Sequence, residues 1–472
     1  MHQRLLFFPF TLLSLFPACD KKKDNPASGA TVQVESWITT GDRTRLLNKQ
    51  TTVVSFTADG DNQNTIIVDS VEKFQTVDGF GYTLTGGSAY LINRMDPSAK
   101  TALLQELFGN GAGDIGITYL RLSIGASDLS TEVFSYNDLP AGETDETLQK
   151  FSLSLDTVHL IPVLKDILKI NPQIKLMATP WSAPVWMKDN GKSVGGSLLV
   201  RYYESYAQYF VKYIKAMAAN GITIEAITPQ NEPQNGGNNP SMVMSSTQQA
   251  TFIKNHLGPA FRTAGLSTKI IIWDHNCDNP NFPVSILNDA AAKPFIDGSA
   301  FHLYAGDIST LSFVRSVHPD KNIYFTEQWT GANGSFDGDL KWHLKNVIIG
   351  SMRNWSKVAL EWNLANDPDY GPRTPGGCSE CKGAITINGS NPSRNVGYYI
   401  VAHASKFIPS GSTRIQSSGS SNLLHVSFLR PDGKKVLIVL NESNAAASFS
   451  IDFKNQQAKI TMPANAVGTY IW

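Results

Sequence analysis

Two glutamates each follow an apolar run that is typical of a buried strand. Glu232 lies in the segment TPQNEP at 228–233, and Glu327 lies in YFTEQW at 324–329. Cleavage of a glycosidic bond requires a pair of carboxyl groups that flank that bond. A lone glutamate at a strand end is often a surface acid, but the flanking Asn231 and Pro233 argue against that interpretation for Glu232. The pair therefore predicts glycosidase chemistry.

Polar and aromatic side chains also follow the other predicted strands. The residues at these strand ends are Arg121, Trp181, Asn231, Asp274, His275, His302, Tyr304, Trp329, Trp362 and Asn363. Five of the nine tryptophans lie in these segments, at positions 181, 186, 273, 329 and 362. A single tryptophan is often core packing, but tryptophans gathered at one site favour stacking on sugar rings.

Metal catalysis is the alternative chemistry for this set of residues. The run from Asp274 to Asp278, together with His302, could supply oxygen and nitrogen ligands. The chain has nine histidines, and none of them stands in a His-x-His or His-Glu-x-x-His spacing. We therefore expect these residues to line the cleft, and we expect neither a metal nor another cofactor.

The elements that position these side chains alternate between strand and helix. Candidate strands are 76–81, 118–123, 174–178, 224–228, 270–273, 300–303, 322–326 and 357–360. Residues 198–219 have helical spacing and end at Asn220-Gly221, and a capping-box pattern at 246–249 begins a helix that closes near Gly265. Eight such alternations predict an α/β fold, a (β/α)8 TIM barrel whose active site lies where the strands end.

A doubly wound open sheet is the structural competitor to the barrel. That fold leads one to expect a glycine-rich phosphate turn after an early strand. The candidate segment at 79–82, Gly-Phe-Gly-Tyr, lacks the spacing of such a turn. The barrel is therefore preferred.

The two ends of the chain share a different texture, with short β-rich runs separated by polar turns. Such runs occur at 32–34, 52–56 and 66–68, and again at 423–428, 436–440, 447–453 and 467–472. Neither end alone makes much of a core. We expect one side β-sandwich built from 31–77 and 405–472, with the catalytic barrel at 78–404.

The first residues are typical of an export signal. A short basic start precedes an apolar stretch, 5–16, that is too short to span a bilayer. The segment FPAC at 16–19 resembles a bacterial lipoprotein signal, although Phe16 departs from the small aliphatic residue usual there. We expect a signal peptide at 1–18, lipidation of Cys19 and a solvated tether at 19–30. The protein is then expected to be exported and anchored to a membrane, in the periplasm or at the cell surface. Plain secretion is the alternative.

Composition narrows the remaining classes of function. The 40 basic residues balance the 40 acidic ones, and charged residues make up only 17% of the 472, so no basic face for nucleic acid is evident. Cys378 and Cys381 lie in a glycine-rich loop, and export favours a local disulfide over a redox centre. Cys277 is left as a buried or free thiol. Two thiols cannot complete a structural zinc site unaided.

Several segments together resemble glycoside hydrolase family 30, which contains acid β-glucosylceramidases and microbial β-1,6-glucanases. The segments are TPQNEP at 228–233, YFTEQW at 324–329, PWSAPVWMK at 180–188 and EWNLA at 361–365. The similarity runs from about residue 74 to the C-terminus. It implies a retaining enzyme on a (β/α)8 barrel with a side β-sandwich.

The resemblance also implies a role for each matching residue. Glu232 corresponds to the acid/base and Glu327 to the nucleophile. The subsite for the sugar being cleaved is implied to contain Arg121, Asp128, Trp181, Asn231, Tyr304 and Trp362, with His302 close by.

Each of these roles has a physical reason. Asn231 can bond the sugar 2-hydroxyl. Arg121 and Tyr304 can hold Glu327 ionised, whereas Glu232 needs a raised pKa in order to arrive protonated. A structural ion pair between Arg121 and Asp128 is the competing interpretation for those two residues.

The substrate follows less directly from the sequence. Asp128, Trp181 and Trp362 match a glucose-holding pattern, and the loop 367–383, with GGCSECKG at 376–383, resembles the β-1,6-glucanase side of the family. This favours β-1,6-glucan or gentio-oligosaccharides, cleaved by a monomer. The alternatives are glucosylceramide or another β-glucoside, then a β-xyloside or β-fucoside. An inactive glycan-binding surface lipoprotein is the alternative from another class.

Overall fold

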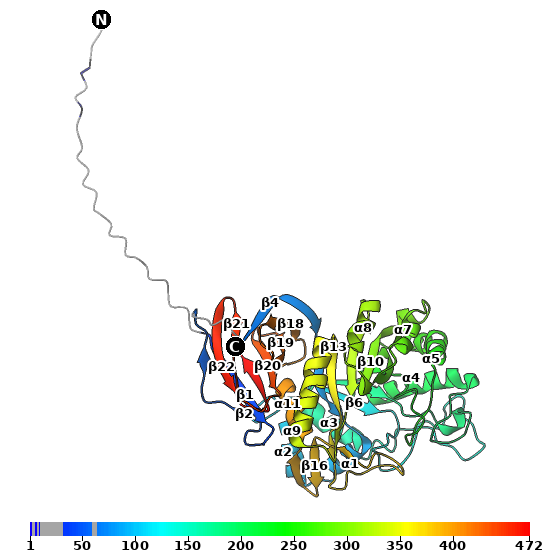
Figure 1. Cartoon of the computed structure of the whole chain (residues 1–472). Helices are drawn as coiled ribbons and strands as arrows, with labels where there is room; N and C mark the ends of the chain where they lie inside the picture. The colour runs from blue at the N-terminus through cyan, green and yellow to red at the C-terminus, as the bar shows by residue number, and fades with distance from the viewer. Residues whose placement is uncertain (2–4, 7–8, 10–31, 59–63) are drawn as a thin grey trace.

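The computed structural model describes residues 32–58 and 64–472, together with residues 1, 5–6 and 9. The chain forms a barrel and an adjoining β-sandwich that packs against one side of it (Figure 1). Cys19, for which the sequence predicts lipidation, lies outside the described residues, as do the predicted tether and nearly all of the predicted signal peptide. In the part of the chain that is described, no helix has the length and apolar character needed to cross a membrane.

Eight parallel strands close the barrel, as the sequence predicts. In chain order they are β5 (Gly79–Thr83), β6 (Tyr119–Ser123), β7 (Lys175–Thr179), β8 (Ala226–Ile227), β9 (Lys269–Cys277), β10 (Ile296–Gly306), β11 (Asn322–Glu327) and β13 (Ser356–Asn363). The boundaries differ most at β10 and β9, which extend well beyond the expected 300–303 and 270–273. Strand β8 keeps two residues of the expected five, and residue 76 ends the long sandwich strand β4 (Thr65–Thr76) instead of beginning the first barrel strand.

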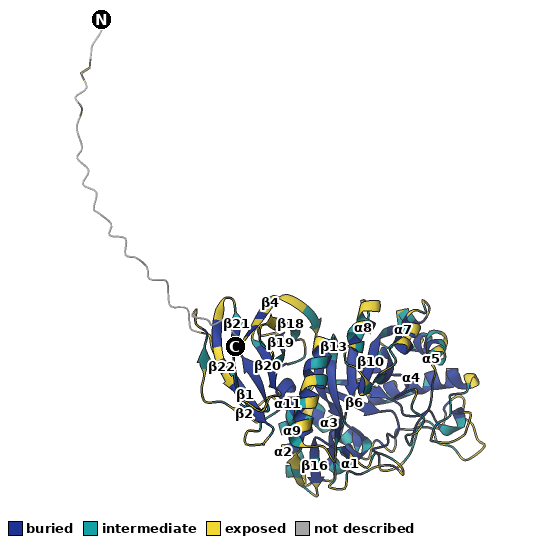
Figure 2. Cartoon of the chain, in the orientation of Figure 1, coloured by how far each residue is buried: buried dark blue, intermediate teal, exposed yellow. Residues whose placement is uncertain are grey.

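Helices surround the barrel and cover its strands, which are buried along almost their whole length (Figure 2). The α-helices are α1 (Gly86–Asn93), α2 (Pro97–Phe108), α3 (Leu160–Ile170), α4 (Tyr203–Ala219), α5 (Ser246–Phe252), α6 (Gly258–Thr263), α7 (Asn281–Leu287), α8 (Thr310–Val317), α9 (Phe336–His343), α10 (Ser351–Arg353) and α11 (Val396–Ser405). A π-helical turn at Ile253–Leu257 joins α5 to α6, and another at Leu344–Gly350 joins α9 to α10. The capping box of α5 is formed by Ser245 and Gln248, so this helix is capped one residue earlier than predicted.

The barrel interior is built in layers, because alternate residues of a strand point to the same side. The lower layer is apolar and consists of Tyr119, Met177, Ala226, Ile271, Ala300, Tyr324, Val358 and Leu360. Two residues further along five of these strands lie Arg121, Thr179, Thr228, His302 and Thr326, which are all fully buried. The period of two thus places a polar layer directly on an apolar floor, at the end of the barrel where the strands finish.

Register shifts between neighbouring strands change which side chains face the barrel mouth. The pairing of β10 with β9 passes from Trp273 to His275 and skips Asp274. The pairing of β10 with β11 passes from Phe325 to Glu327. An extra residue of this kind re-aims the side chains that follow it. The side chains of consecutive residues such as Thr326 and Glu327 can therefore both point into the barrel at its mouth.

The β-sandwich combines the two ends of the chain, as expected. From the N-terminal side it takes β1 (Gln33–Thr40), β2 (Asn48–Lys49), β3 (Val54–Ser55) and β4, and from the C-terminal side β18 (Thr413–Gly419), β19 (Leu424–Leu429), β20 (Lys435–Asn441), β21 (Ala447–Phe453), β22 (Gln456–Met462) and β23 (Ala466–Ile471). Strand β1 pairs with β23, and β4 pairs with β18 and β21. His403 of α11 bonds Thr39 and Thr469, and so ties the barrel to this sheet.

Candidate active site

A cavity of about 380 Å³ opens at the mouth of the barrel. Ligand pockets commonly occupy about 300 to 1,000 Å³, so this one is near the small end of the range. It is lined by Asp128, Trp181, Glu232, Asn235, Asn238, His275, Asn276, Tyr304, Glu327, Trp329, Trp362, Cys378 and Cys381. Both predicted catalytic glutamates therefore face the same cavity.

Glu327 ends β11 and is 5% exposed. Arg121 donates to its Oε2 at 2.5 Å, and the Tyr304 hydroxyl donates to its Oε1 at 2.9 Å. Burial raises the pKa of Glu327, while the positive charges of His302 and Arg121 oppose that rise. The two donors fix the carboxylate and direct it into the cavity.

Glu232 lies on the turn after β8, and its backbone is in the left-handed region with φ of 44°. This conformation is uncommon for a residue with a side chain, and it is often found at functional sites. The Glu232 amide donates to the carbonyl of Asp274 at 3.0 Å, which fixes the turn. Its Oε2 accepts from Asn235 at 2.7 Å and from Asn238 at 3.5 Å.

The separation of the two carboxyl groups indicates the stereochemical course. An oxygen of Glu232 and an oxygen of Glu327 lie within 4.8 Å of each other. Retaining glycosidases hold their carboxyl groups about 5 to 5.5 Å apart, and inverting ones about 6.5 to 9.5 Å, because the latter need room for a water molecule. The geometry is that of a retaining enzyme.

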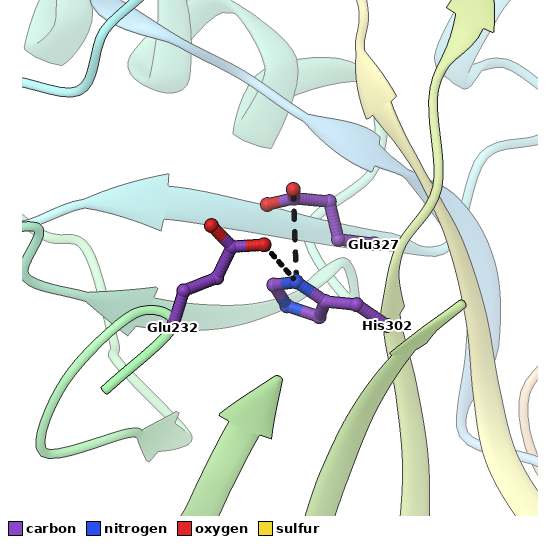
Figure 3. Close-up of side chains that lie close together, drawn as sticks. All are labelled: Glu232, His302 and Glu327. Atoms are coloured by element: carbon purple, nitrogen blue, oxygen red, sulfur yellow. Dashed lines mark hydrogen bonds and ion pairs between the residues drawn. The ribbon is translucent and has the colours of Figure 1, made fainter. Parts of the chain in front are cut away.

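His302 lies between the two glutamates (Figure 3). Its Nδ1 is 3.2 Å from Oε1 of Glu232 and 3.7 Å from Oε1 of Glu327, and its Nε2 is 3.1 Å from Oδ1 of Asp274. Burial alone would lower the pKa of His302, but the three surrounding carboxylates prevail and raise it to about 9. The imidazole is thus a buried cation near neutral pH.

The protonation of Glu232 differs from the sequence-based expectation. Burial raises its pKa, but the hydrogen bond and the charge of His302 outweigh burial and lower the pKa to about 2. The expected raised pKa is therefore wrong for the free enzyme. The physical reason is that His302, whose Nδ1 lies 3.2 Å from Oε1 of Glu232, holds a proton, and its charge stabilises the Glu232 carboxylate.

Asp274 links the partners of both glutamates and has no exposed surface. Its Oδ2 accepts from Arg121 at 3.0 Å, Thr179 at 3.0 Å and Thr228 at 2.7 Å. Its Oδ1 accepts from Thr326 at 2.7 Å and faces His302. These contacts hold the pKa of Asp274 far below its usual range. One buried carboxylate therefore orients the Arg121 that holds Glu327 and the His302 that holds Glu232.

Part of the cavity lining is aromatic. Trp181 and Trp362 lie with ring centroids 5.3 Å apart and planes inclined by 34°. The Trp181 Nε1 is buried and has no hydrogen-bond partner among the described residues. A sugar hydroxyl could accept from this indole, and the apolar faces suit the C–H surface of a sugar ring.

Not every predicted sugar-binding residue faces the cavity. Asp128, Trp181, Tyr304 and Trp362 line it, whereas Arg121, Asn231 and His302 do not belong to its lining. Arg121 and His302 have no exposed surface. Arg121 bonds Glu327 from behind the cavity wall, as the sequence-based reasoning allows, and His302 lies beside Glu232 in the same buried layer.

Two further points refine the predicted contacts. Arg121 pairs with Glu327 and Asp274, so its ion pairs do not include the Asp128 considered from the sequence. Asn231 accepts from Arg121 through Oδ1 at 2.6 Å, and its amide nitrogen has no partner within the described part of the chain. That nitrogen remains available for a sugar hydroxyl.

Some site residues were missed at the level of sequence. The missed residues are Asn235 and Asn238, which bond Glu232 and line the cavity. His275, Asn276 and Trp329 also line the cavity, and they come from the strand-end segments already noted in the sequence. The asparagine-rich run NEPQNGGNN at 231–239 is a usable signal for the first two. The disulfide between Cys378 and Cys381 also lines the cavity, while Cys277 is a buried free thiol behind the site.

Glu232, His302 and Glu327 also form a set of three metal-type donor atoms, all within 4.8 Å of one another. Both ring nitrogens of His302 face carboxylates already, through Glu232 and Asp274. An ion bound here would have to displace the His302 contact to Glu232. The donor set fits proton transfer between the three groups better than metal coordination.

Comparison with known proteins covers nearly the whole described chain. Residues 77–408 match the glycosyl hydrolase family 30 TIM-barrel domain, and 411–470 match the glycosyl hydrolase family 30 β-sandwich domain. An endo-1,6-β-D-glucanase of Aspergillus fumigatus is 32% identical over 425 residues, which is 84% of this chain and 85% of that protein. The lysosomal acid glucosylceramidase of Mus musculus is 30% identical, covering 85% of this chain and 82% of its own length.

A solved structure gives the same picture in three dimensions. That structure, an endo-β-1,6-glucanase, has a TM-score of 0.87 and 34% sequence identity, and the match covers 93% of this chain and 99% of the other.

Proposed function

The chain belongs to glycosyl hydrolase family 30, a family of retaining glycosidases, and from this premise we propose that it hydrolyses β-1,6-glucan at internal bonds with retention of configuration. The observation that carries the proposal is the pair of carboxyl groups in one cavity, with oxygens within 4.8 Å of each other. This pair also argues against an inactive glycan-binding protein, because both groups are present and oriented.

In the first step, a carboxylate oxygen of Glu327 attacks C1 of the sugar, and the bond from C1 to the leaving oxygen breaks. The electron pair of that bond stays on the leaving oxygen, which takes a proton from Glu232. The pair of Glu232 and His302 holds this proton in the free enzyme. Arg121 and Tyr304 keep Glu327 ionised and pointed at C1 until the ester forms.

In the second step, Glu232 acts as a base. Its carboxylate takes a proton from water while the water oxygen bonds to C1, and the ester bond to Glu327 breaks. The proton returns to the pair of Glu232 and His302, and Glu327 is a carboxylate again. Two inversions at C1 give overall retention.

The substrate rests on the relatives and on the cavity wall. Relatives named as endo-1,6-β-glucanases match the chain over about five-sixths of its length or more, in sequence and in structure. Asp128 and the two tryptophans supply polar and apolar surface for one glucose unit. The small cavity favours a short stretch of chain over a long groove.

A second candidate substrate is glucosylceramide. It is favoured by the 30% identity to the mouse enzyme over 85% of this chain.

We also propose, from the N-terminal sequence, that the enzyme is an exported lipoprotein anchored through Cys19 and acting as a monomer. Mass spectrometry of the mature N-terminus tests the lipid, and light scattering tests the monomer.

Product analysis separates the two substrates. Incubation with β-1,6-glucan should release a mixture of oligosaccharides, with little turnover of glucosylceramide under matched conditions. Glucose alone from the polymer would contradict the endo mode. Rapid cleavage of glucosylceramide with an untouched polymer would replace the proposed substrate with the second candidate.

A further inference from the structure

A short strap, residues 374–382, crosses the cavity wall and is closed by the disulfide between Cys378 and Cys381. Both cysteines line the cavity, and Cys381 packs in one apolar cluster with Leu129, Trp181 and Trp362. The catalytic steps described above do not use this strap. Several of its contacts are with Asp128.

The strap donates hydrogen bonds to both the backbone and the side chain of Asp128. The Thr374 amide donates to the Asp128 carbonyl at 2.9 Å, and the Cys378 amide donates to Oδ2 of Asp128 at 3.3 Å. A Cβ at Gly377 would lie 2.2 Å from the same carbonyl, so only glycine allows this approach. Asp128 and the strap are therefore fitted together at close range.

The Asp128 carboxylate depends on the strap for its orientation. Within the described residues, its one hydrogen bond from another residue is that from Cys378. Burial and the charge of Glu327 raise the pKa of Asp128 to about 7, although the hydrogen bond from the Cys378 amide opposes that rise. A buried acid with one protein donor and an open face toward the cavity is suited to accepting from, or donating to, a sugar hydroxyl.

The disulfide links Cys378 to a residue, Cys381, that is held firmly against the barrel. On one side, Cys381 is anchored in β15 (Cys381–Lys382), which pairs with β12 (Thr330–Gly331) just after Glu327, and its carbonyl accepts from Asn366 at 2.8 Å. On the other side, Cys378 is half-buried and is linked to that anchor through sulfur. The bond thus fixes the amide that holds Asp128.

The strap also reaches the loop that carries the acid/base. The Thr374 hydroxyl donates to the carbonyl of Asn239 at 2.5 Å, and the Asn239 side chain donates to the carbonyl of Pro375 at 3.0 Å. Asn239 adjoins Asn238, which contacts Glu232. These contacts come before Cys378 in the chain and do not need the disulfide, so opening the bond should spare Glu232.

We propose that the Cys378–Cys381 disulfide positions Asp128 for binding of the sugar in the cleavage subsite, and that this contact is lost when the bond is opened. The inference rests on the proposed glycosidase function, but it does not depend on the β-1,6 linkage. Cys378 and Cys381 are positioning residues, because they act through Asp128.

A double-mutant cycle tests the proposal. The wild type, C378S/C381S, Asp128→Ala and the combined variant are compared for binding of deoxynojirimycin, a glucose-shaped iminosugar, by calorimetry. C378S/C381S and Asp128→Ala should each weaken binding of the iminosugar by about tenfold, as for one lost hydrogen bond to a charged group. The combined variant should be no weaker than Asp128→Ala alone, because both changes remove one contact.

The same four proteins are assayed on 4-nitrophenyl β-glucoside, with thermal unfolding to check the fold. Reductant should lower kcat/KM of the wild type toward that of C378S/C381S and leave that variant unchanged. Losses that multiply in the combined variant, or unchanged binding by C378S/C381S, would overturn the proposal. If the combined variant binds no more weakly than Asp128→Ala but β-1,6-glucan is not cleaved, only the proposed substrate would be overturned.

Discussion

Nδ1 of His302 lies 3.2 Å from Oε1 of Glu232, and this contact decides where the catalytic proton is held. The imidazole is buried, and its other nitrogen faces Asp274 at 3.1 Å. The pair of Glu232 and His302 therefore carries one proton at neutral pH, and the proton lies on the histidine. Of these two residues, Glu232 lines the cavity and His302 does not, so in the proposed mechanism Glu232 delivers to the sugar the proton that His302 holds.

Replacing His302 by glutamine should narrow the pH profile of kcat/KM from both sides. In the wild type, the pair loses its proton as pH rises through about 9, the pKa of His302, and activity falls there. Without the cation, Glu232 must hold the proton itself and will lose it at lower pH. The pKa of Glu327 should rise further, because His302 lowers it in the wild type, so the acidic limb should move up.

His275→Gln is the matched control for that profile. Burial lowers the pKa of His275 to about 4, so this histidine is neutral over the working range. Its replacement should leave both limbs in place. Limbs that stay fixed in His302→Gln would contradict the storage of the proton on His302.

Asp274→Asn should lower kcat/KM by about 10²-fold or more and should also destabilise the fold. The neutral amide cannot accept from all of Arg121, His302 and the threonines, and two buried cations lose their common partner. Steady-state kinetics and thermal unfolding measure the two effects. A full loss of stability with unchanged kcat/KM in the folded fraction would contradict a positioning role.

Asp297→Asn provides the comparison at the other end of the barrel. Asp297 accepts from Asn322 at 2.9 Å and from the Tyr324 hydroxyl at 2.5 Å, far from the cavity lining. We expect a lower unfolding temperature and little change in kcat/KM. This difference separates the catalytic end of the barrel from the structural end.

Sequence periodicity predicted the barrel and placed both glutamates at the ends of its strands. Each strand is an apolar run that ends in polar residues, and parallel strands bring those ends to one mouth. The sequence therefore predicts that Glu232 and Glu327 share one site, and both line the same cavity. The β-sandwich was also predictable, because both chain ends share short β-rich runs, although β18 and β22 were not anticipated.

The inward turn of Asp274 was not predictable from periodicity. The register skips this residue between β9 and β10, and its φ of 61° is unusual for a non-glycine residue. Local sequence does not specify such a bulge, since it depends on the neighbouring strand. The low pKa of Glu232 was missed for a similar reason, because it depends on His302, which is 70 residues away along the chain.

Glu232→Gln should make the rate depend on the leaving group. Hydrolysis of β-1,6-linked oligosaccharides should fall by about 10² to 10⁴, because the departing alkoxide needs a proton. Release of 2,4-dinitrophenol from its β-glucoside should fall much less in the first step, since that group leaves as a stable anion. Glu225→Gln, at the far end of the barrel, is the control and should lose neither activity. Equal losses on both substrates would count against Glu232 as the acid.

Asp156→Asn should change how stability depends on pH. Burial raises the pKa of Asp156 to about 7, and its partner is the Tyr136 hydroxyl at 2.5 Å. The folded state therefore keeps a proton that the unfolded state releases near pH 4, so this group makes stability fall as pH rises toward 7. Asparagine keeps the acceptor and has no such dependence. The gain in unfolding temperature should be larger at pH 8 than at pH 5, and an equal gain at both would refute this account.

Covalent trapping of Glu327 tests the central claim most directly. A 2-deoxy-2-fluoro-β-glucoside with a good leaving group should form the glycosyl ester and then stall, because the fluorine slows its hydrolysis. Peptide mass spectrometry should find one added fluoroglucosyl group on Glu327, with activity lost in proportion. A label on another residue, or steady turnover with no labelled peptide, would contradict the assignment of Glu327 as the nucleophile.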